Sequence, residues 1–265
     1  MVTNAYNVTG SFGEFTTAIQ SRWNEGYDLV DVEYGDGTWF GVFQNKPGGN
    51  GYDISGSLGE FTTAIQNRWS QGYHLVDVEY GNGTWFGVFQ QDSGANAFNP
   101  ASSLNELTTA IQSRWNEGYD LVDVEYGDGT WFGVFQNKPG GNGYDISGSL
   151  GEFTTDIKTM WDRGSDLVGV EYGNGNWFGV FQDTPSTNAY SSARNINDFT
   201  TAIKNRWDEG YELVDVGYGD GLWFGVFLGS TSSNLQSSAV NLVTTQLELE
   251  SLKSIVLASQ DVLKV

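Results

Sequence analysis

The sequence predicts an α+β repeat protein of five helix–hairpin (αββ) units, each 46 residues long. Three features of every unit lead to this prediction: two tryptophans at constant positions, an apolar stripe at helical spacing, and an Asx-Gly pair between two strand-like segments. The first tryptophan series is Trp23, Trp69, Trp115, Trp161 and Trp207. The second is Trp39, Trp85, Trp131, Trp177 and Trp223, and we expect both series in the core.

The units begin at a landmark that reads Asn4-Ala5-Tyr6 in its first copy. Successive copies divide the chain into a five-repeat domain, residues 4–233, and a tail, residues 234–265. The single repeats span 4–49, 50–95, 96–141, 142–187 and 188–233. Residues 16–63 are identical to residues 108–155, which indicates an internal duplication of a pair of repeats.

Each repeat is predicted to contain a helix of about three turns. Ser11 and Glu14 form a capping-box pattern, in which a hydroxyl and a carboxylate satisfy backbone N–H groups of the first turn. Phe15 and Trp23 lie on one apolar stripe of this helix. Gly26 follows, where a left-handed residue typically ends a helix.

Two strands joined by a tight turn are predicted to follow the helix. Asp36-Gly37 is typical of a two-residue type I′ hairpin turn. The face that carries Val30, Val32 and Tyr34 is apolar and is expected under the helix. The turn predicts these pairs across the hairpin: Tyr34 with Trp39, Val32 with Gly41, Val30 with Phe43, Glu33 with Phe40, Asp31 with Val42 and Leu29 with Gln44.

One helix and one hairpin are too small to bury a core, so neighbouring repeats must pack against one another. Repeats one and five keep the aromatic positions and lack the polar outer face that caps a solenoid. The pattern therefore favours a closed, propeller-like ring with pseudo-fivefold symmetry over an open solenoid.

The residues that recur around the hairpin of the first repeat are Arg22, Trp23, Gly26, Tyr27, Leu29, Val30, Val32, Tyr34, Gly35, Gly37, Trp39, Phe40, Gly41, Val42 and Phe43. Their W…GY…YGxGxW spacing resembles a tandem aromatic- and glycine-rich repeat of unknown function in bacterial proteins, some of them attached to serine/threonine kinases. The resemblance covers residues 4–233, implies a non-catalytic repeat module and supplies no catalytic residues.

The chain has 33 Asp and Glu against 12 Lys and Arg, a formal net charge of −21. This charge repels phosphate backbones and anionic lipid headgroups, so neither nucleic acid nor a membrane surface is an expected partner. The chain has no cysteine, and therefore no disulfide or thiolate metal site. The sequence shows neither a long apolar span nor a signal-peptide pattern at its start, which predicts a soluble protein, cytoplasmic or exported by a signal-independent route.

Catalytic patterns are scarce in this sequence. The single histidine, His74, takes the position of Asp28 in the first repeat, and we interpret it as a surface substitution rather than a catalytic base. The sequence contains neither a Gly-x-Ser-x-Gly elbow nor a zinc, P-loop or dinucleotide motif. It therefore predicts a protein that is not an enzyme.

Pairs of carboxylates recur along the first strand of the hairpins at Asp31, Glu33, Asp77, Glu79, Asp123 and Glu125. If a ring closed with this face inward, such oxygen-rich clusters would suit Ca²⁺. Gly169 and Gly217 interrupt the series, so the favoured interpretation is a solvated strand face, paired in part with Arg22, Arg68, Arg114 and Arg206. The sequence predicts no cofactor and no metal site, with Ca²⁺ as the one candidate.

The aromatic residues favour a carbohydrate ligand, because Trp and Tyr stack on sugar rings while Asn and Asp bind hydroxyls. Repeated weak sites would also gain avidity from multivalency. The candidate contacts are the landmark residues, the turn residues and one aromatic position of the last strand. They are Asn4, Tyr6, Asp36, Phe40, Asn50, Tyr52, Asn82, Phe86, Asn96, Phe98, Asp128, Phe132, Asn142, Tyr144, Asn174, Phe178, Asn188, Tyr190, Asp220 and Phe224.

The tail carries a heptad-like apolar stripe at Leu242, Leu249, Leu252, Val256 and Leu263. It predicts an amphipathic helix that packs back onto the ring, self-associates into a homo-oligomer, or docks onto a different partner. The sequence thus predicts a non-enzymatic, multivalent binding module, with carbohydrate as the favoured ligand. The alternative is a structural or assembly protein whose C-terminal helix mediates oligomerisation or docking to a protein partner.

Overall fold

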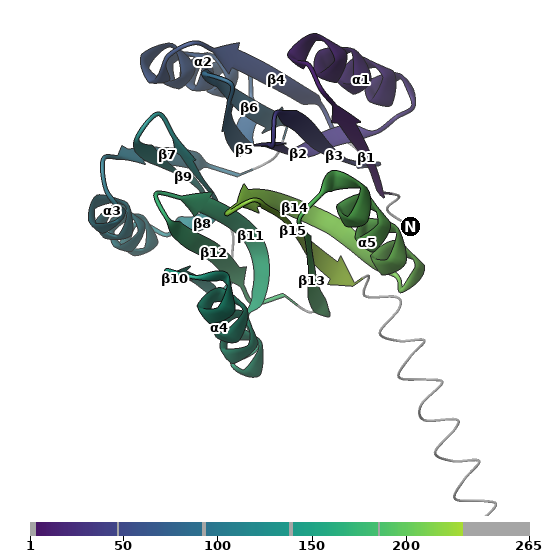
Figure 1. Cartoon of the computed structure of the whole chain (residues 1–265). Coiled ribbons are helices and arrows are strands. Elements are labelled where there is room, and N and C mark those ends of the chain that lie inside the picture. Colours follow the sequence, from purple (N-terminus) through teal and green to yellow (C-terminus); the bar gives the residue numbers. More distant parts are fainter. Residues whose placement is uncertain (1–3, 47, 92–93, 138–139, 185, 230–265) are drawn as a thin grey trace, which may run out of the picture.

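The computed structural model describes residues 4–46, 48–91, 94–137, 140–184 and 186–229. Within them each repeat is a strand, a helix and two further strands (Figure 1). The first repeat contains β1 (Asn4–Thr9), α1 (Phe12–Asn24), β2 (Asp28–Gly35) and β3 (Thr38–Gln44). The second contains β4 (Asn50–Ser55), α2 (Leu58–Ser70), β5 (His74–Gly81) and β6 (Thr84–Gln90).

The remaining repeats have the same element order. The third contains β7 (Asn96–Ala101), α3 (Leu104–Asn116), β8 (Asp120–Gly127) and β9 (Thr130–Gln136). The fourth contains β10 (Asn142–Ser147), α4 (Leu150–Asp162), β11 (Asp166–Gly173) and β12 (Asn176–Gln182). The fifth contains β13 (Asn188–Ala193), α5 (Ile196–Asp208), β14 (Tyr211–Gly219) and β15 (Leu222–Gly229).

The first strand of each repeat corrects the predicted αββ unit to βαββ. The sequence landmark at Asn4 is the start of β1, which pairs antiparallel with β3, so each sheet has the order β1-β3-β2. The strand β3 lies in the centre because its residues are apolar on both faces and are buried from Trp39 to Gln44. A central strand needs partners on both edges, and a hairpin alone supplies only one.

The predicted N-cap, helix end and turn are confirmed, whereas the Glu14 carboxylate accepts from Ser11 Oγ, at 2.9 Å, and not from the predicted backbone N–H. The Ser11 side chain accepts a hydrogen bond from the backbone N–H of Glu14, as an N-cap does. Gly26 ends the helix in the left-handed region, with φ 83°. Asp36 and Gly37 have φ 50° and 72°, as a type I′ turn requires.

The predicted register is confirmed near the turn and wrong at the other end of the hairpin. Tyr34 lies opposite Trp39, as predicted, but Leu29 lies opposite Phe43 because the register shifts between Leu29 and Asp31. Val30 is the extra residue of this β-bulge. Val30 therefore lies outside the core beneath α1; it lines a pocket and packs against the core that the first and fifth repeats share.

Each hydrophobic core is built from two neighbouring repeats. Phe15 and Trp39 of the first repeat share a core with Phe86 of the second. The first and fifth repeats share a core in the same way, through Phe40 and Phe199. The packing explains why one unit is too small to fold by itself, because part of its core, such as Phe86 and Val88 in the core of the first repeat, comes from a neighbouring unit.

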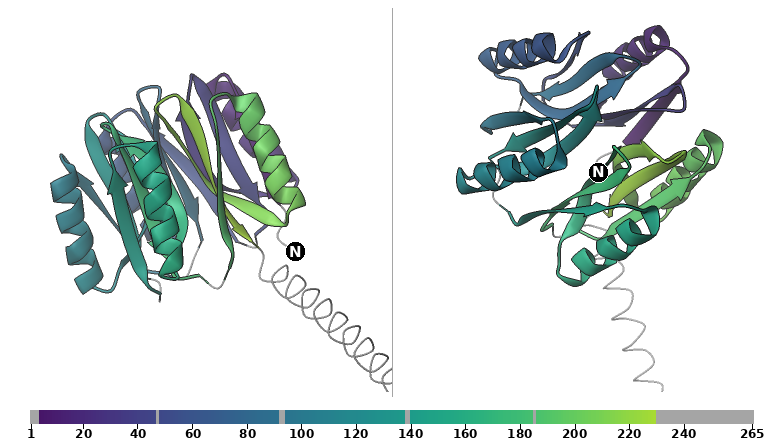
Figure 2. Two further views of the ribbon diagram at one scale, coloured as in Figure 1. Left: turned by 60° about the horizontal axis from the view of Figure 1, so that its bottom comes forward. Right: turned by 60° about the vertical axis from the view of Figure 1, so that its left-hand side comes forward.

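The five helices of the described repeats lie on the outside, and one strand of each repeat lies nearest the centre (Figures 1 and 2). These inner strands are β2, β5, β8, β11 and β14. Each contacts the inner strand of the next repeat, and β14 contacts β2. The described strands form five separate three-stranded sheets rather than one continuous sheet.

A glycine at the end of each inner strand allows the close approach of the neighbouring repeat. A Cβ atom on Gly81 would lie 2.5 Å from the Cβ atom of Tyr34 and 2.8 Å from Trp39. The same relation joins Gly35 to Tyr218, across the contact between the first and fifth repeats. Only a residue without a side chain fits at these positions.

The predicted tail helix, with Leu242, Leu249, Leu252, Val256 and Leu263, lies outside the described residues. In the part of the chain that the structure describes, no helix has the length and apolar character needed to cross a membrane.

Candidate functional site

The asparagine that begins each repeat ties that repeat to the one before it. The Oδ1 atom of Asn50 accepts hydrogen bonds from the indole N–H of Trp23, at 2.7 Å, and from Leu29 N, at 3.0 Å. Its Nδ2 atom donates to the carbonyl oxygens of Leu29 and Phe89, at 2.8 and 3.2 Å. All the ordinary bonding capacity of this carboxamide is thus used within the protein. Asn4 bonds in the same way to Trp207 and Leu213 of the fifth repeat.

The aromatic candidates divide into buried and partly exposed groups. Phe40 and its equivalents Phe86, Phe132, Phe178 and Phe224 are completely buried, so a ligand has no access to their rings. Tyr6 is partly exposed and stacks on Phe40, with ring centroids 5.5 Å apart. Its equivalents Tyr52, Phe98, Tyr144 and Tyr190 are also partly exposed.

The two tryptophan series also differ in burial. The Trp39 series is buried, as predicted. The prediction that the Trp23 series belongs to the core holds only in part, because these five side chains pack against the core clusters but are only partly buried. Each lies at a boundary, where its ring packs against the aromatic landmark residue of the next repeat. The ring centroids are 5.7 Å apart for Trp23 and Tyr52, and 5.6 Å apart for Trp207 and Tyr6.

A groove of about 380 Å³ lies at the boundary between the fourth and fifth repeats. Its lining is Trp161, Asn188, Ala189, Tyr190, Arg206 and Tyr211. The indole N–H of Trp161 donates to Asn188, which fixes the orientation of the tryptophan ring. The Arg206 guanidinium donates to Ser191 Oγ and to the carbonyl oxygen of Tyr190, each at 3.0 Å. The groove therefore presents aromatic rings beside a positioned cation.

The same residue types recur at the other boundaries, with one exception. Arginine occupies the position of Arg206 in four of the five repeats, as Arg22, Arg68, Arg114 and Arg206. The fourth repeat has Met160 there, and Ser165 in place of Tyr211. The boundary between the third and fourth repeats thus keeps Trp115 and Tyr144 but loses the cation and the tyrosine at the position of Tyr211.

The turn residues lie away from these grooves. Asp36, Asn82, Asp128, Asn174 and Asp220 are exposed and all have positive φ angles between 48° and 51°. They follow the end of each inner strand, whereas the landmark asparagines bond to its beginning, at Leu29 in the first repeat. The structure therefore does not bring the turn residues and the landmark residues into one site.

The recurring carboxylates occupy the centre of the molecule and not a solvated face, so that interpretation is wrong. Eight carboxyl groups line a central chamber of about 10 Å³ together with the valines that follow them. They are Asp31, Asp77, Asp123, Asp215, Glu33, Glu79, Glu125 and Glu171, and each is at most 9 % exposed. Arg22 instead pairs with Glu25, at 2.9 Å. The strands β2, β5, β8, β11 and β14 face one another, and this arrangement turns their acidic face inward.

These carboxyl groups bond to the neighbouring repeat. The inner strand is an edge strand of its sheet, so alternate backbone N–H groups lack a partner within the sheet. A carboxyl group of the next repeat accepts from such groups. The bonds are Val32 N to Asp77 (3.1 Å), Val78 N to Asp123 (2.9 Å), Val170 N to Asp215 (2.9 Å), Tyr80 N to Glu125 (3.1 Å) and Tyr126 N to Glu171 (3.3 Å).

The exception to this pattern occurs where the sequence lacks a carboxylate. The fourth repeat has Gly169 in place of the aspartate, so Val124 N has no side chain of the next repeat to bond. It donates instead to Asp123 of its own strand, at 2.8 Å. Asp77, Asp123, Asp215, Glu125 and Glu171 thus act as structural acceptors between repeats.

Burial shifts the titration of all eight carboxyl groups in one direction. It raises the pKa of Asp123 to about 7 and that of Glu171 to about 8. The pKa values of the other six lie well above their ordinary values, mainly because of burial and next because neighbouring carboxyl groups repel a negative charge. Neutral carboxyl groups are therefore favoured in the folded chain.

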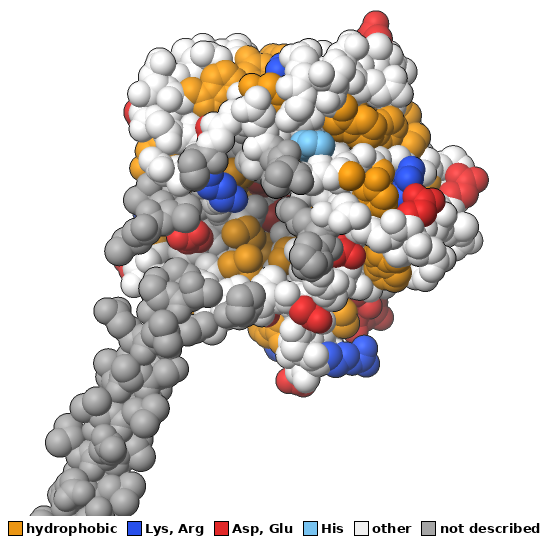
Figure 3. Space-filling model, turned by 180° about the vertical axis from the view of Figure 1, so that it is seen from behind, with side chains coloured by type: hydrophobic (Ala, Val, Ile, Leu, Met, Phe, Trp, Pro, Cys, Tyr) orange, Lys and Arg blue, Asp and Glu red, His pale blue; other side chains and the backbone are white. Residues whose placement is uncertain are grey.

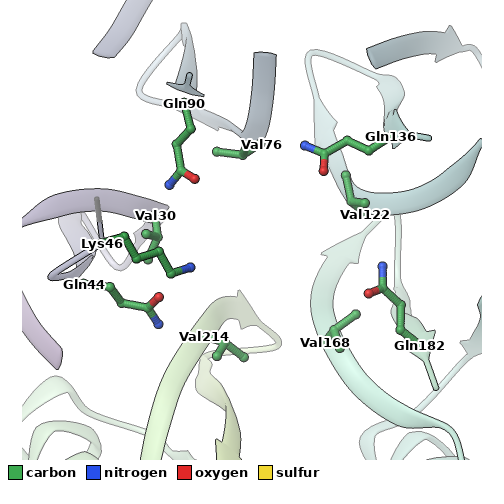
Figure 4. Close-up of a pocket in the computed structure, with 10 residues that line it drawn as sticks. All are labelled: Val30, Gln44, Lys46, Val76, Gln90, Val122, Gln136, Val168, Gln182 and Val214. Carbon is green, nitrogen blue, oxygen red and sulfur yellow. The ribbon is translucent and has the colours of Figure 1, made fainter. Parts of the chain in front are cut away.

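A pocket of about 220 Å³, which we call the vestibule, lies at the end of the inner strands where the bulges occur. Its lining is Val30, Val76, Val122, Val168, Val214, Gln44, Gln90, Gln136, Gln182 and Lys46, which extend toward its centre (Figure 4). The Gln136 side chain is 3 % exposed, and its Oε1 atom has no hydrogen-bond partner. Figure 3 shows a face of the molecule that is hollowed at its centre.

Among the described residues, no group of three or more His, Asp or Glu side chains has the arrangement of a metal site. His74 lies at the start of β5 and is partly buried. Sequence reasoning missed Arg206, Tyr211 and their equivalents as groove residues. Their constant spacing from the boundary tryptophan is the signal that could have identified them, since Trp161 and Arg206 are 45 residues apart.

The chain was compared with known proteins. A scan against models of protein families gives no match, and a search of curated proteins gives none either.

Proposed function

We propose that this chain is a non-enzymatic, multivalent module that binds carbohydrate in the grooves between neighbouring repeats. The observation that carries the proposal is the recurrence of a partly exposed tryptophan and a second aromatic ring at a repeat boundary, with an arginine beside them in four of the five repeats. Side chains of this kind present an apolar face beside polar donors, which suits a ligand with both apolar and hydroxyl surfaces.

The groove at Trp161 illustrates the proposed contacts. The indole N–H of Trp161 is used by Asn188, so the ring offers a sugar its face and not its donor. The guanidinium of Arg206 uses three of its five N–H groups on Ser191, Tyr190 and Glu209. We assign its remaining donors to sugar hydroxyl groups. Because Arg206 is held by these bonds, it needs little ordering on binding.

Ring closure gives the proposal its valency. In a closed, propeller-like ring with pseudo-fivefold symmetry, Trp207 and Tyr6 form a fifth boundary, which has its arginine at Arg22. The contact between the fifth and first repeats and the bonds of Asn4 support this closure. Four shallow sites on one rigid body, at the boundaries that keep the arginine, would bind a branched or repeating glycan with much greater avidity than one site.

A glycan-array screen tests the proposal, with Ca²⁺ and with a chelator in parallel. We expect binding to a related set of sugars in both conditions. The test variant replaces Arg22, Arg68, Arg114 and Arg206 by methionine, the residue that the fourth repeat has naturally at position 160. The matched control is Arg163→Met, which changes an exposed arginine at the end of α4.

The groove variant is expected to lose most of its array signal, whereas the control keeps the signal of the unmodified chain. An empty array, or equal binding by the groove variant and the unmodified chain, would contradict the proposal.

A further inference from the structure

The central chamber is a second feature, independent of the grooves. Its eight carboxyl groups are four aspartates and four glutamates, and each of these two sets comes from four of the five repeats. No Lys, Arg or His side chain lines the chamber among the residues that the structure describes. Lys46 lies in the vestibule, where it attracts Asp28 and Glu212. The chamber thus concentrates acid groups without a lining cation.

Eight ionised carboxylates in so small a space would repel one another strongly, because burial removes the water that screens them. The chamber volume of about 10 Å³ holds one water molecule at most. Water therefore cannot hydrate the charges. Protons remain the simplest means of neutralising them.

Two observations at Asp31 indicate bound protons. The Asp31 carboxyl is buried among the carboxyl groups of Asp215, Asp77 and Asp123, so burial and next their negative charges raise its pKa well above the ordinary value. The other observation is that Asp31 Oδ2 has no hydrogen-bond partner, although the residue is only 3 % exposed. A neutral, protonated oxygen is less costly at such a position than a charged one.

The carboxyl groups also hold the repeats together, through the bonds from Val32, Val78 and Val170 described above. Repulsion between ionised groups would act along these same contacts. We propose that the central chamber is a proton-dependent lock, in which protonated carboxyl groups hold the inner strands together and their ionisation weakens the contacts between repeats.

The charged groups that face the chamber all act in one direction. Each inner strand contributes at least one carboxyl group, and Asp31 is affected by Asp77, Asp123, Asp215 and Glu33. The Tyr218 hydroxyl adds no positive charge. Burial raises its pKa most, and the negative charges of Asp36 and Glu33 raise it further. The raised carboxyl pKa values agree with this geometry, because the folded chain then binds protons that the unfolded chain releases.

The sign of the pH effect follows. Unfolded carboxyl groups release their protons near pH 4, whereas Asp123 and Glu171 release them near pH 7 and 8 in the folded chain. The stabilisation that these two groups contribute is therefore fully present below about pH 4, and it is lost as the pH rises through 7 and 8. We expect the thermal midpoint to fall by at least about 10 °C between pH 5 and pH 9.

The test measures the thermal midpoint of the full chain from pH 4 to pH 9, for the unmodified chain and for Asp123→Asn/Glu171→Gln. The substituted amides mimic the neutral carboxyl groups, so this variant should show a smaller fall at high pH. The control Glu25→Gln changes an exposed carboxylate and should follow the unmodified chain. A midpoint that is constant or rises from pH 5 to pH 9 would overturn the proposal.

A second measurement does not depend on the folding of a variant. Carbon-13 chemical shifts of the carboxyl groups in the unmodified chain report each titration directly. We expect a group of carboxyl signals that are still protonated at pH 6. Titration of every carboxyl group below pH 5 would overturn the proposal. So would a thermal midpoint at pH 8 that Ca²⁺ raises and a chelator lowers, because a cation would then occupy the chamber.

Discussion

Replacing Gly81 by alanine tests the close packing between repeats. A Cβ atom at this position would lie 2.5 and 2.6 Å from the Cβ and Cγ atoms of Tyr34, and 2.8 Å from Trp39. Real Cβ atoms do not approach other atoms so closely, and the Cβ of Tyr34 is fixed to the backbone of the neighbouring inner strand. The extra methyl group must therefore move one repeat away from the other.

The expected cost follows from the behaviour of overpacked cores. Inserting a methyl group into a well-packed interior typically costs about 1–3 kcal/mol, and a contact with atoms next to the backbone belongs at the upper end. For a domain of this size each kcal/mol lowers the thermal midpoint by about 2–4 °C. We expect Gly81→Ala to lose about 3 kcal/mol and to melt about 6–12 °C below the unmodified chain.

Urea denaturation followed by tryptophan fluorescence gives the free energy of unfolding. The matched control is Gly59→Ala, because a Cβ atom on Gly59 meets nothing within 4 Å and the residue lies in the first turn of α2. The control should be as stable as the unmodified chain or gain up to about 1 kcal/mol from reduced backbone entropy. If Gly81→Ala unfolds at the same urea concentration as Gly59→Ala, the reasoning about inter-repeat packing is refuted.

Three further substitutions test other contacts by the same urea assay. Asn50→Ala removes four inter-element hydrogen bonds and should lower the free energy of unfolding by about 3 kcal/mol. A loss below about 1 kcal/mol would show that these bonds are not structural. Asn82→Ala keeps a β-carbon in the left-handed region, φ 51°, but removes the short polar side chain that lets asparagine adopt it, and should cost about 1 kcal/mol. Asn82→Gly should cost nothing, and equal stability of the two variants would contradict the turn assignment. Arg68→Met breaks a partly exposed ion pair with Asp53 and should lower the free energy of unfolding by less than about 1 kcal/mol. A loss above about 2 kcal/mol would show a larger structural role for the arginine.

The features that the sequence predicted correctly are those decided by neighbouring residues. The N-cap at Ser11, the helix end at Gly26 and the type I′ turn at Asp36-Gly37 depend on a few consecutive residues, and the structure confirms each. The bulge at Val30 was not predictable in this way. It depends on tertiary packing, because the extra residue is placed toward the vestibule that all five repeats line.

The chamber shows why burial is harder to infer than secondary structure. Asp31 and Glu33 alternate with apolar residues, a pattern that is typical of a strand with one face in water. Only the contact of each inner strand with the next encloses that face. A signal was present, because the residues opposite these acids, Val42 and Phe40, are apolar and lie on the same face of the sheet.

To predict the groove residues, one must likewise know how the repeats pack against one another. Trp161 and Arg206 belong to different repeats, and the packing of successive units brings them together. The landmark asparagines attracted attention as ligand contacts because they recur, but recurrence also follows from a structural role such as that of Asn50.

The central claim is that the boundaries that keep the arginine are equivalent binding sites. Isothermal titration of the full chain with the strongest sugar found on the array counts these sites. The account predicts about four equivalent, weak sites per chain, at the boundaries that keep the arginine, and the loss of one site when Trp161 is replaced by alanine. A single site per chain, or a stoichiometry that the substitution of Trp161 leaves unchanged, would contradict it.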